Sequence, residues 1–271
     1  MQEIKINRIF VTYLTHKNKH LVMLKEERHH HILDKIKLSR KVLSSDLSLE
    51  LNVSEDTIRR DLNELSSRGL IKKVHGGALP MDKKTLTYDE RSEYNLKEKN
   101  DIAKKAVSLI KDGQVIIMSG STTNLQLAKI IPSDINATIY TYSLPIALQL
   151  TEHPSIEIIF IGGKLYKPAQ VTVGLDVVSS ISQLRADLCF MGTGGINISN
   201  GMTEPNWEVS HIKKCMIEAS DKVIVLCTKN KVNEVKRYPV TPINRIDTIV
   251  TDTNPEDPIF NPFKEKGVSI L

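Results

Sequence analysis

The chain has 271 residues, of which 40% are hydrophobic and 25% are charged, so a small domain and a larger one both fit within a globular protein. Its three cysteines, Cys189, Cys215 and Cys227, are too few and too far apart for a disulfide framework, which favours a reducing cytoplasm. No apolar run is long enough to cross a bilayer, and we expect no membrane partner. The net charge of +5 comes entirely from residues 1–80, a pattern that suits nucleic-acid contact at one end of the molecule.

Residues 1–22 are basic and show neither a helical nor a strand period. They lack the apolar core and the small-residue cleavage site of a signal peptide. We expect a disordered extension, or sequence upstream of a true start at Met23.

Two short helical patterns follow the extension. The first covers residues 25–36, and three apolar residues share its inner face: Ile32, Leu33 and Ile36. Ser44 or Ser45 is expected to cap the second helix, which buries Leu47 and Leu51. Asn52-Val53 then makes a turn.

Ser54 is expected to cap a third helix, whose apolar residues recur at i, i+4 and i+7: Ile58, Leu62 and Leu65. At 100° per residue, Arg60 points away from this apolar stripe and Arg59 lies to one side. Gly69 ends the helix, and a basic hairpin begins with a strand over residues 70–74.

This order of parts predicts a winged helix-turn-helix over residues 23–79, with the third helix in a DNA major groove and the lysine pair on the backbone. The candidate contacts to double-stranded operator DNA are Ser54, Asp56, Thr57, Arg59, Arg60, Asn63, Lys72, Lys73 and His75. The alternative is a solvated arginine pair on an ordinary surface helix. Consecutive histidines at 29–31 point about 100° apart on a helix, so we expect a solvated face and no metal site there.

A connecting segment is expected over residues 80–96, followed by a larger α/β domain over 97–271. An amphipathic helix covers residues 97–111. Beyond it, β-rich runs alternate with helices, and the predicted strands are 114–118, 137–142, 157–161, 187–191, 222–227 and 246–251. This alternation predicts a parallel sheet, which binds ligands at the carboxyl ends of its strands.

The first predicted strand ends in a small, hydroxyl-rich loop that can surround a phosphate: Gly120, Ser121, Thr122 and Thr123. The alternative is a simple Ser/Thr-rich helix cap. Lys213 and Lys231 are the cations expected to balance an anionic ligand. Tyr142-Ser143 and two glycine-rich turns, at 162–163 and 191–195, end other strands.

The run Thr57-Ile-Arg-Arg-Asp-Leu62, followed by His75-Gly-Gly-Ala78, resembles the signature of the DeoR family of bacterial transcriptional regulators. The resemblance implies a repressor of a sugar-catabolism operon that leaves its operator when a phosphorylated sugar binds. It also implies a sensor domain similar to ribose-5-phosphate isomerase and glucosamine-6-phosphate deaminase. Gly120 to Thr123 match the family's phosphate loop, whereas Ser119 and Thr228 stand where the family has aspartates, which leaves the identity of the sugar open.

The leading prediction is therefore a DNA-binding regulator with a phosphorylated sugar as effector, no catalytic residues and no cofactor. A single DNA-binding module reads few base pairs, so we expect a homo-oligomer. One alternative is a sugar-phosphate isomerase or deaminase carrying a DNA-binding module, with Glu204 or Glu208 as its base. Another is a transcriptional activator, since the sign of regulation depends on the position of the operator.

Overall fold

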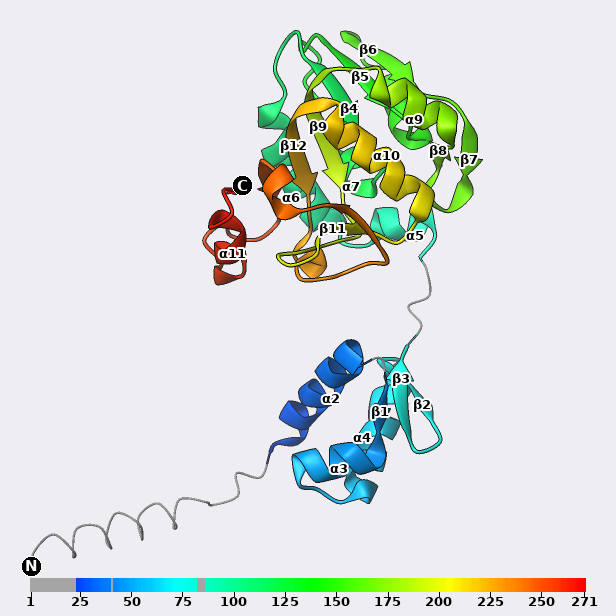
Figure 1. Ribbon diagram of the computed structural model, residues 1–271, viewed down its shortest axis with the longest axis vertical. Helices are drawn as coiled ribbons and strands as arrows, with labels where there is room; N and C mark the ends of the chain where they lie inside the picture. Colours follow the sequence, from blue (N-terminus) through cyan, green and yellow to red (C-terminus); the bar gives the residue numbers. More distant parts are fainter. Residues whose placement is uncertain (1–22, 40, 82–85) are drawn as a thin grey trace, which may run out of the picture. The chain divides into compact units, whose positions relative to one another are not determined.

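The computed structural model describes residues 23–39, 41–81 and 86–271 (Figure 1). The predicted basic extension, residues 1–22, lies outside the described residues. The chain divides into two compact units between Thr85 and Leu86, and each unit has a hydrophobic core of its own.

Three helices and a small antiparallel sheet form the first unit. The helices are α2 (Lys25–Ser39), α3 (Ser44–Leu51) and α4 (Glu55–Ser67). The strands are β1 (Val42–Leu43), β2 (Ile71–Val74) and β3 (Gly77–Pro80), in the order β1-β3-β2. Their order is that of a helix-turn-helix followed by a wing, as the sequence predicts.

The apolar stripe of α4 is the centre of this core. Its predicted residues, Ile58, Leu62 and Leu65, are all fully buried. Ser54 caps α4 as predicted, because its side chain accepts a hydrogen bond from the Thr57 N–H at 3.2 Å.

The predicted cap of the second helix is wrong. Helix α3 begins at Ser44 with Leu43 at the cap position, and no side chain caps it. The Ser44 N–H donates to the carbonyl of Gly76 at 2.8 Å, so the wing provides a partner for the first free N–H group of this helix.

A buried ionic cluster joins α2 to α4. Arg28 donates from Nε and Nη2 to the two carboxylate oxygens of Asp61, at 2.5 and 3.0 Å, and His29 Nε2 lies 3.1 Å from the same carboxylate. Burial raises the pKa of Asp61, but the hydrogen bonds from Arg28 and His29 outweigh it, and the pKa lies below its ordinary value. The predicted solvated histidine face is wrong for His29, which is only 2% exposed; His31 pairs with Glu50 at 2.9 Å.

A seven-stranded parallel sheet forms the centre of the second unit, in the order β15-β14-β12-β9-β4-β5-β6. The strands are β4 (Val115–Met118), β5 (Ala137–Thr141), β6 (Ile156–Phe160), β9 (Ala186–Gly192), β12 (Ser220–Leu226), β14 (Thr248–Val250) and β15 (Ser269–Ile270). All six predicted strands are present in it. The seventh, β15, has two residues and left no pattern in the sequence.

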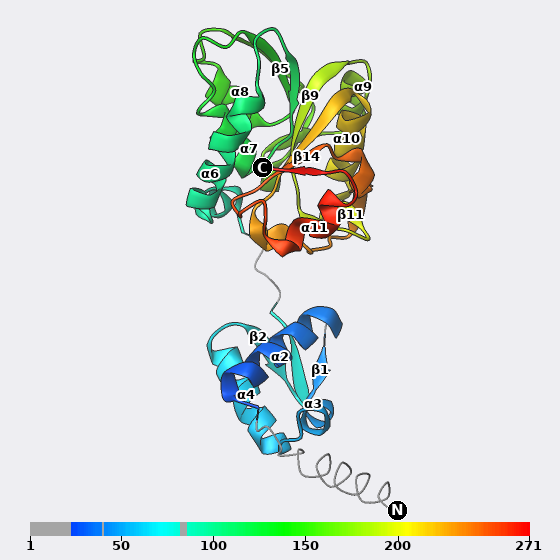
Figure 2. The same ribbon diagram turned by 90° about the vertical axis from the view of Figure 1, so that its left-hand side faces the viewer.

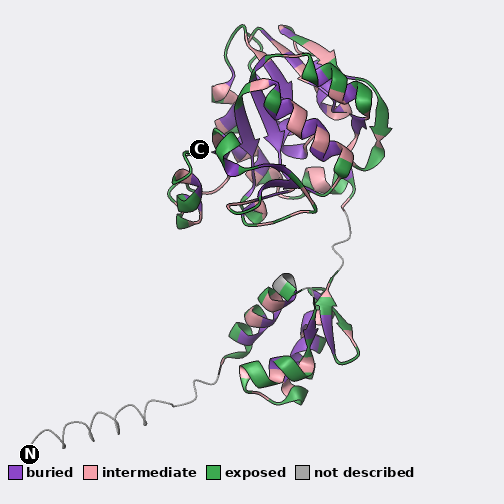
Figure 3. Cartoon of the chain, viewed as in Figure 1, coloured by how far each residue is buried: buried purple, intermediate pink, exposed green. Residues whose placement is uncertain are grey.

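Helices cover both faces of this sheet (Figure 2). One face carries α6 (Leu96–Ala106), α7 (Thr122–Ala128) and α8 (Leu144–Leu150), and the other carries α9 (Leu175–Ser182) and α10 (Trp207–Glu218). Strand residues alternate between the two cores: Ile116 and Met118 pack with the first group, and Ile117 with the second. Figure 3 shows the resulting buried sheet between helices whose outer faces are exposed.

Shorter elements surround the sheet. They are α5 (Tyr88–Glu93), β7 (Lys164–Tyr166), β8 (Val171–Val173), β10 (Gly195–Asn197), β11 (Gly201–Glu204), β13 (Tyr238–Thr241), α11 (Asn261–Lys264) and the 3₁₀ turns η1 (Val107–Leu109), η2 (Lys167–Ala169), η3 (Lys229–Lys231), η4 (Ile243–Arg245) and η5 (Pro258–Phe260). Strands β10, β11 and β13 form a small sheet, and β7 pairs with β8. Among the described residues, none of the helices has both the length and the apolar character needed to span a bilayer.

The predicted connecting segment, residues 80–96, is too long. Pro80 belongs to β3, and α5 lies within the second unit, where it packs against α7. Helix α5 starts with a capping box: the Thr87 hydroxyl accepts from the Glu90 N–H, and the Glu90 carboxylate accepts from the Thr87 N–H. This helix has no long apolar period, which explains why its sequence reads as a connection.

The strand order identifies the ligand-binding edge of the sheet. Strands β5 and β6 lie on one side of β4, and the later strands lie on the side of β9. The order therefore reverses between β4 and β9, and open α/β sheets bind ligands outside the carboxyl ends of strands at such a switch point.

A candidate DNA-contacting surface and a candidate effector site

The outer edge of α4 is polar and exposed. The side chain of Arg60 is 84% exposed and that of Arg59 is 62% exposed. Asp56 lies between them, with carboxylate oxygens 3.6 Å from Arg59 Nη1 and 3.7 Å from Arg60 Nη2. Ion pairs this exposed contribute little stability, so the arginines are available for another partner.

The wing places its two lysines beside this edge. Lys72 and Lys73 are exposed on β2, and Lys73 Nζ donates to Asn63 Oδ1 at 2.6 Å, which ties the wing to α4. A Cβ on Gly77 would stand 2.0 Å from the carbonyl oxygen of Val42, so only glycine lets the hairpin approach β1 this closely.

The nine predicted DNA contacts all lie at the N-cap of α4, on α4 itself, or on the β2–β3 hairpin. All are exposed except the half-buried Thr57: Ser54, Asp56, Thr57, Arg59, Arg60, Asn63, Lys72, Lys73 and His75. Seven of them already have protein partners: Ser54 and Thr57 share the α4 cap, Asn63 accepts from Lys73, and Asp56 pairs with both Arg59 and Arg60. Their contact with DNA stays a prediction.

Ser119, which follows β4, connects the two strands at the switch point. It is fully buried, and its hydroxyl oxygen accepts from the Gly192 N–H at 2.9 Å and from Asn124 Nδ2 at 3.2 Å. Asn124 Nδ2 also lies 2.9 Å from the carbonyl oxygen of Phe190 on β9. Ser119 therefore joins β4 to β9 and contributes to the frame of the site.

The predicted phosphate loop lies at this edge. Ser121 caps α7, accepting from the Asn124 N–H at 2.9 Å, while Thr122 and Thr123 are 8% and 2% exposed. Gly120 is half-buried, and a Cβ there would stand 2.2 Å from Val171 Cγ1, so the backbone passes close to β8. The four predicted loop residues are thus adjacent, but their hydroxyls are less open than the sequence suggests.

Lys213 is not the free cation that the sequence predicts. It is 2% exposed, and its ammonium donates to Glu204 Oε2 at 2.5 Å and to the Gly192 carbonyl at 2.7 Å. A buried ion pair with a second hydrogen bond is already balanced. The structure therefore adds Glu204, at the end of β11, to the residues of this site.

Lys231 differs from Lys213. Within the described residues it makes no ion pair and no side-chain hydrogen bond, although it follows β12 at the same edge of the sheet. Burial lowers the pKa of Lys231, against opposing effects from Cys227 and Glu204, and the positive charges of Lys213 and Arg91 add smaller contributions that lower it further. An anion at this edge would relieve that repulsion.

Two further cations come from the start of this unit: Arg91 from the segment predicted to be a linker, and Lys99 from the predicted helix at residues 97–111. Arg91 on α5 donates to the carbonyls of Leu86 and Pro168, at 2.8 and 2.7 Å. Lys99 on α6 donates to the carbonyls of Arg91 and Tyr94. Burial lowers the pKa of Lys99 to about 8, and Lys231 and Arg91 contribute to the shift. Their electrostatic interaction with Lys231, which their positions in the sequence do not indicate, links both residues to the site.

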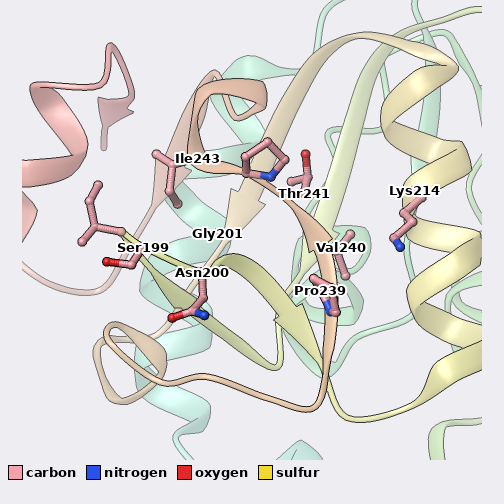
Figure 4. A pocket seen from close by; sticks show the side chains of 10 residues that line it. Ser199, Asn200, Gly201, Lys214, Pro239, Val240, Thr241 and Ile243 are labelled. Carbon is pink, nitrogen blue, oxygen red and sulfur yellow. The ribbon is translucent and has the colours of Figure 1, made fainter.

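A surface pocket elsewhere on the second unit has a different character (Figure 4). Its volume is about 300 Å³, and it lies between the β11–β13 region and α10. Lys214 is the one charged residue in its lining, and none of the predicted effector residues contributes to it. Lacking the hydroxyl loop and the cation cluster, this pocket is a poorer phosphate site than the switch point.

Comparison with known proteins matches both units to family models. Residues 28–84 match the DeoR-like helix-turn-helix domain, and residues 94–253 match the DeoR C terminal sensor domain. Among solved structures, ribose 5-phosphate isomerase A from Methanocaldococcus jannaschii covers 51% of this chain and 55% of its own, with 17% identity and a TM-score of 0.38. That likeness is too distant to carry functional information.

Curated relatives align along most of their length. The HTH-type transcriptional regulator GolR of Listeria innocua is 32% identical over 90% of this chain and 97% of its own. The HTH-type transcriptional repressor GlcR of Bacillus subtilis is 32% identical over 92% and 96%, and the glycerol-3-phosphate regulon repressor of Escherichia coli is 30% identical over 86% and 93%. With a winged helix-turn-helix in one unit and a sensor domain in the other, this chain belongs to the DeoR family of DNA-binding transcriptional regulators.

Proposed function

We propose that the chain represses a sugar-catabolism operon and that a phosphorylated sugar releases it from its operator. The observation that carries the proposal is Lys231, a cation without a partner among the described residues, at the same sheet edge as the Gly120–Thr123 loop. Phosphate oxygens accept hydrogen bonds from backbone N–H groups, hydroxyls and ammonium groups, and this edge offers all three.

DNA recognition is assigned to α4 and the wing. Arg60 is more exposed than Arg59, and its side chain is long enough to reach a base edge in the major groove. Lys72 and Lys73 fit the adjacent phosphates, since backbone contacts fix orientation while base contacts supply specificity.

Release follows from linkage. A ligand that binds more tightly to the DNA-free state shifts the population toward it, by no more than its difference in affinity between the two states. A phosphorylated sugar at the β4–β9 edge therefore weakens operator binding to the same degree that the operator weakens sugar binding.

The alternative function, that of an enzyme, would need a base at the strand ends, and the two positions there do not supply one. Isomerisation and deamination of sugar phosphates need a proton acceptor next to the bound substrate. Ser119 and Thr228 occupy the two strand-end positions, and both are neutral hydroxyls engaged with the protein; Thr228 donates to Asn230 Oδ1 at 2.6 Å. Glu204 is paired with Lys213.

The names of two relatives favour repression over activation. GlcR and the Escherichia coli relative are both called repressors. We also propose a homo-oligomer, because one winged helix-turn-helix reads only a few base pairs. Multi-angle light scattering on the full chain tests this, and a monomer at operator-saturating concentrations would contradict it.

The DNA-binding part is tested with Arg60→Ala against a DNA fragment selected from genomic DNA by the wild-type protein. We expect operator affinity to fall about 5- to 150-fold, the effect of losing one base-contacting arginine, in fluorescence anisotropy. Arg68→Ala is the matched control, because Arg68 is exposed at the other end of the same helix. Equal affinity for wild type and Arg60→Ala would refute the assigned recognition helix.

A further inference from the structure

Among the described residues, two buried hydroxyls next to the Gly120–Thr123 loop have no acceptor for their protons. Tyr142 and Ser143 are fully buried, and neither the Tyr142 hydroxyl nor the Ser143 Oγ donates a hydrogen bond to any described residue. Buried polar groups are nearly always satisfied, because an unpaired one costs about 1–3 kcal/mol. Two such groups side by side at a strand end mark a place where a ligand supplies the missing partner.

Their position ties them to the loop. Tyr142 and Ser143 follow β5, which pairs directly with β4, so they lie at the same carboxyl edge as Gly120. A Cβ built on Gly120 would stand 3.5 Å from the Ser143 Cβ. The Thr172 N–H donates to the Tyr142 carbonyl at 2.8 Å, which fixes this backbone against β8.

The Tyr142 hydroxyl lies near the N–H of Gly120 and within electrostatic range of the Glu204 carboxylate. Burial raises the pKa of Tyr142 well above its ordinary value, the negative charge of Glu204 raises it further, and the nearby N–H of Gly120 opposes both. The phenol is therefore a neutral hydroxyl at every physiological pH, able to donate a hydrogen bond as well as accept one.

Glu204 completes the set. Lys213 holds its Oε2, and its side chain is 12% exposed, more open than the 3% of Lys213. It thus provides a fixed carboxylate at an edge where the family's aspartate positions hold the neutral residues Ser119 and Thr228. A carboxylate accepts strongly from hydroxyl donors.

We propose that Tyr142, Ser143 and Glu204 form a hydroxyl-recognising subsite that selects the effector by the polyol part attached to its phosphate. This inference rests on the proposed function, since it takes the phosphate to lie in the Gly120–Thr123 loop. Glu204 accepts from a sugar hydroxyl, and the Tyr142 and Ser143 hydroxyls bind the oxygen next to it. The phosphate supplies affinity, and this subsite distinguishes one phosphate ester from another.

The test measures affinities of the full chain by isothermal titration calorimetry for four probes: inorganic phosphate, glycerol 3-phosphate, ribose 5-phosphate and glucosamine 6-phosphate. Tyr142→Phe and Ser143→Ala each remove a single oxygen. We expect each to weaken the best-bound ester about three- to tenfold, the effect of one neutral hydrogen bond, and to leave inorganic phosphate unchanged. Tyr140→Phe is the control, because Tyr140 is a half-buried tyrosine on β5, two residues before Tyr142.

Glu204→Gln gives a second reading. This substitution keeps the shape of the side chain. It should reduce the differences in affinity among the three esters, because an amide is a weaker acceptor than a carboxylate. Unchanged ester affinities in Tyr142→Phe and Ser143→Ala, or equal losses for esters and inorganic phosphate, would overturn this inference alone. If wild type binds none of the four probes, the proposed effector class fails and the subsite fails with it.

Discussion

The candidate DNA contacts all lie between Ser54 and His75, whereas the candidate effector residues extend from Arg91 to Lys231. The first set is exposed and is positioned by one helix and one hairpin. The second is mostly buried and comes from the ends of several strands and from two helices that precede them. A surface that must reach a duplex can be built locally, but a site that must enclose a small anion needs partners from distant parts of the chain.

The buried ion pairs of the two units show the same contrast. In the DNA-binding unit the interior ion pair, Arg28 with Asp61, joins two helices, while the outer arginines of α4 stay exposed. In the sensor unit the interior pair, Lys213 with Glu204, lies within the site itself. Removing a buried partner should therefore affect folding in the first unit and ligand binding in the second.

The largest expected effect is in the first unit. Asp61→Ala leaves the Arg28 guanidinium buried without its carboxylate, which should destabilise this unit by about 3–5 kcal/mol. Hydrogen exchange of the α2 and α4 amides in the full chain measures it. Asp56→Ala is the matched control, because the Asp56 side chain is 65% exposed, and it should change stability by less than about 0.5 kcal/mol. Similar protection in both variants would contradict the role of the ionic cluster.

Acid should weaken the same unit before the other. The pKa of Asp61 is lower in the folded chain than in the unfolded chain, so its contribution is complete above about pH 4 and is lost as the pH falls through the folded value. We expect exchange in α2 and α4 to accelerate on acidification, and Asp61→Asn to reduce this pH dependence. A sensor unit that opens at higher pH than α2 and α4 would run against this expectation.

A smaller effect is expected at the wing. Lys72 is exposed on β2, and Lys72→Ala should reduce the slope of log affinity against log salt by about 1, the effect of one lost phosphate contact. Operator binding measured by anisotropy across a salt series gives this slope. Lys129→Ala, an exposed lysine of the sensor unit, is the control and should leave the slope unchanged. Equal slopes for Lys72→Ala and wild type would remove the wing from the interface.

The smallest expected effect is that of a substitution in the surface pocket, and it tests where the effector binds. Lys214 neighbours Lys213 in sequence but lines the surface pocket of Figure 4. Lys214→Ala should leave the affinity for phosphate esters unchanged in calorimetry. A clear loss of affinity would move the effector site from the switch point to that pocket.

The sequence predicted the DNA-binding unit well because its signals are local. The Ser54 cap and the Ile58, Leu62 and Leu65 stripe depend on residues a few positions apart, and both are present in the fold. The exceptions involve contacts between elements: the Gly76 carbonyl accepts from the first N–H of α3, which no serine caps, and His29 is buried beside Asp61.

In the sensor unit, periodicity predicted six strands and therefore the edge where the loop lies, but not which side chains meet there. The ion pair between Lys213 and Glu204 joins a helix to a hairpin, and the spacing of the two residues in the sequence does not predict it. Helix α5 was missed because it is short and polar, and Arg91 was missed with it. The unpaired hydroxyl of Tyr142 is visible only when every neighbour is known.

The most direct test of the account is the concentration of phosphate ester that releases operator DNA from wild type and from Lys231→Ala. The ester is the best-bound of glycerol 3-phosphate, ribose 5-phosphate and glucosamine 6-phosphate, and release is followed by anisotropy. We expect wild type to leave the DNA, and Lys231→Ala to need about 10- to 100-fold more ester while binding ester-free operator normally, because one charge-assisted contact is lost. Release of both proteins at the same ester concentration, or of neither, would contradict the claim that this sheet edge controls DNA binding.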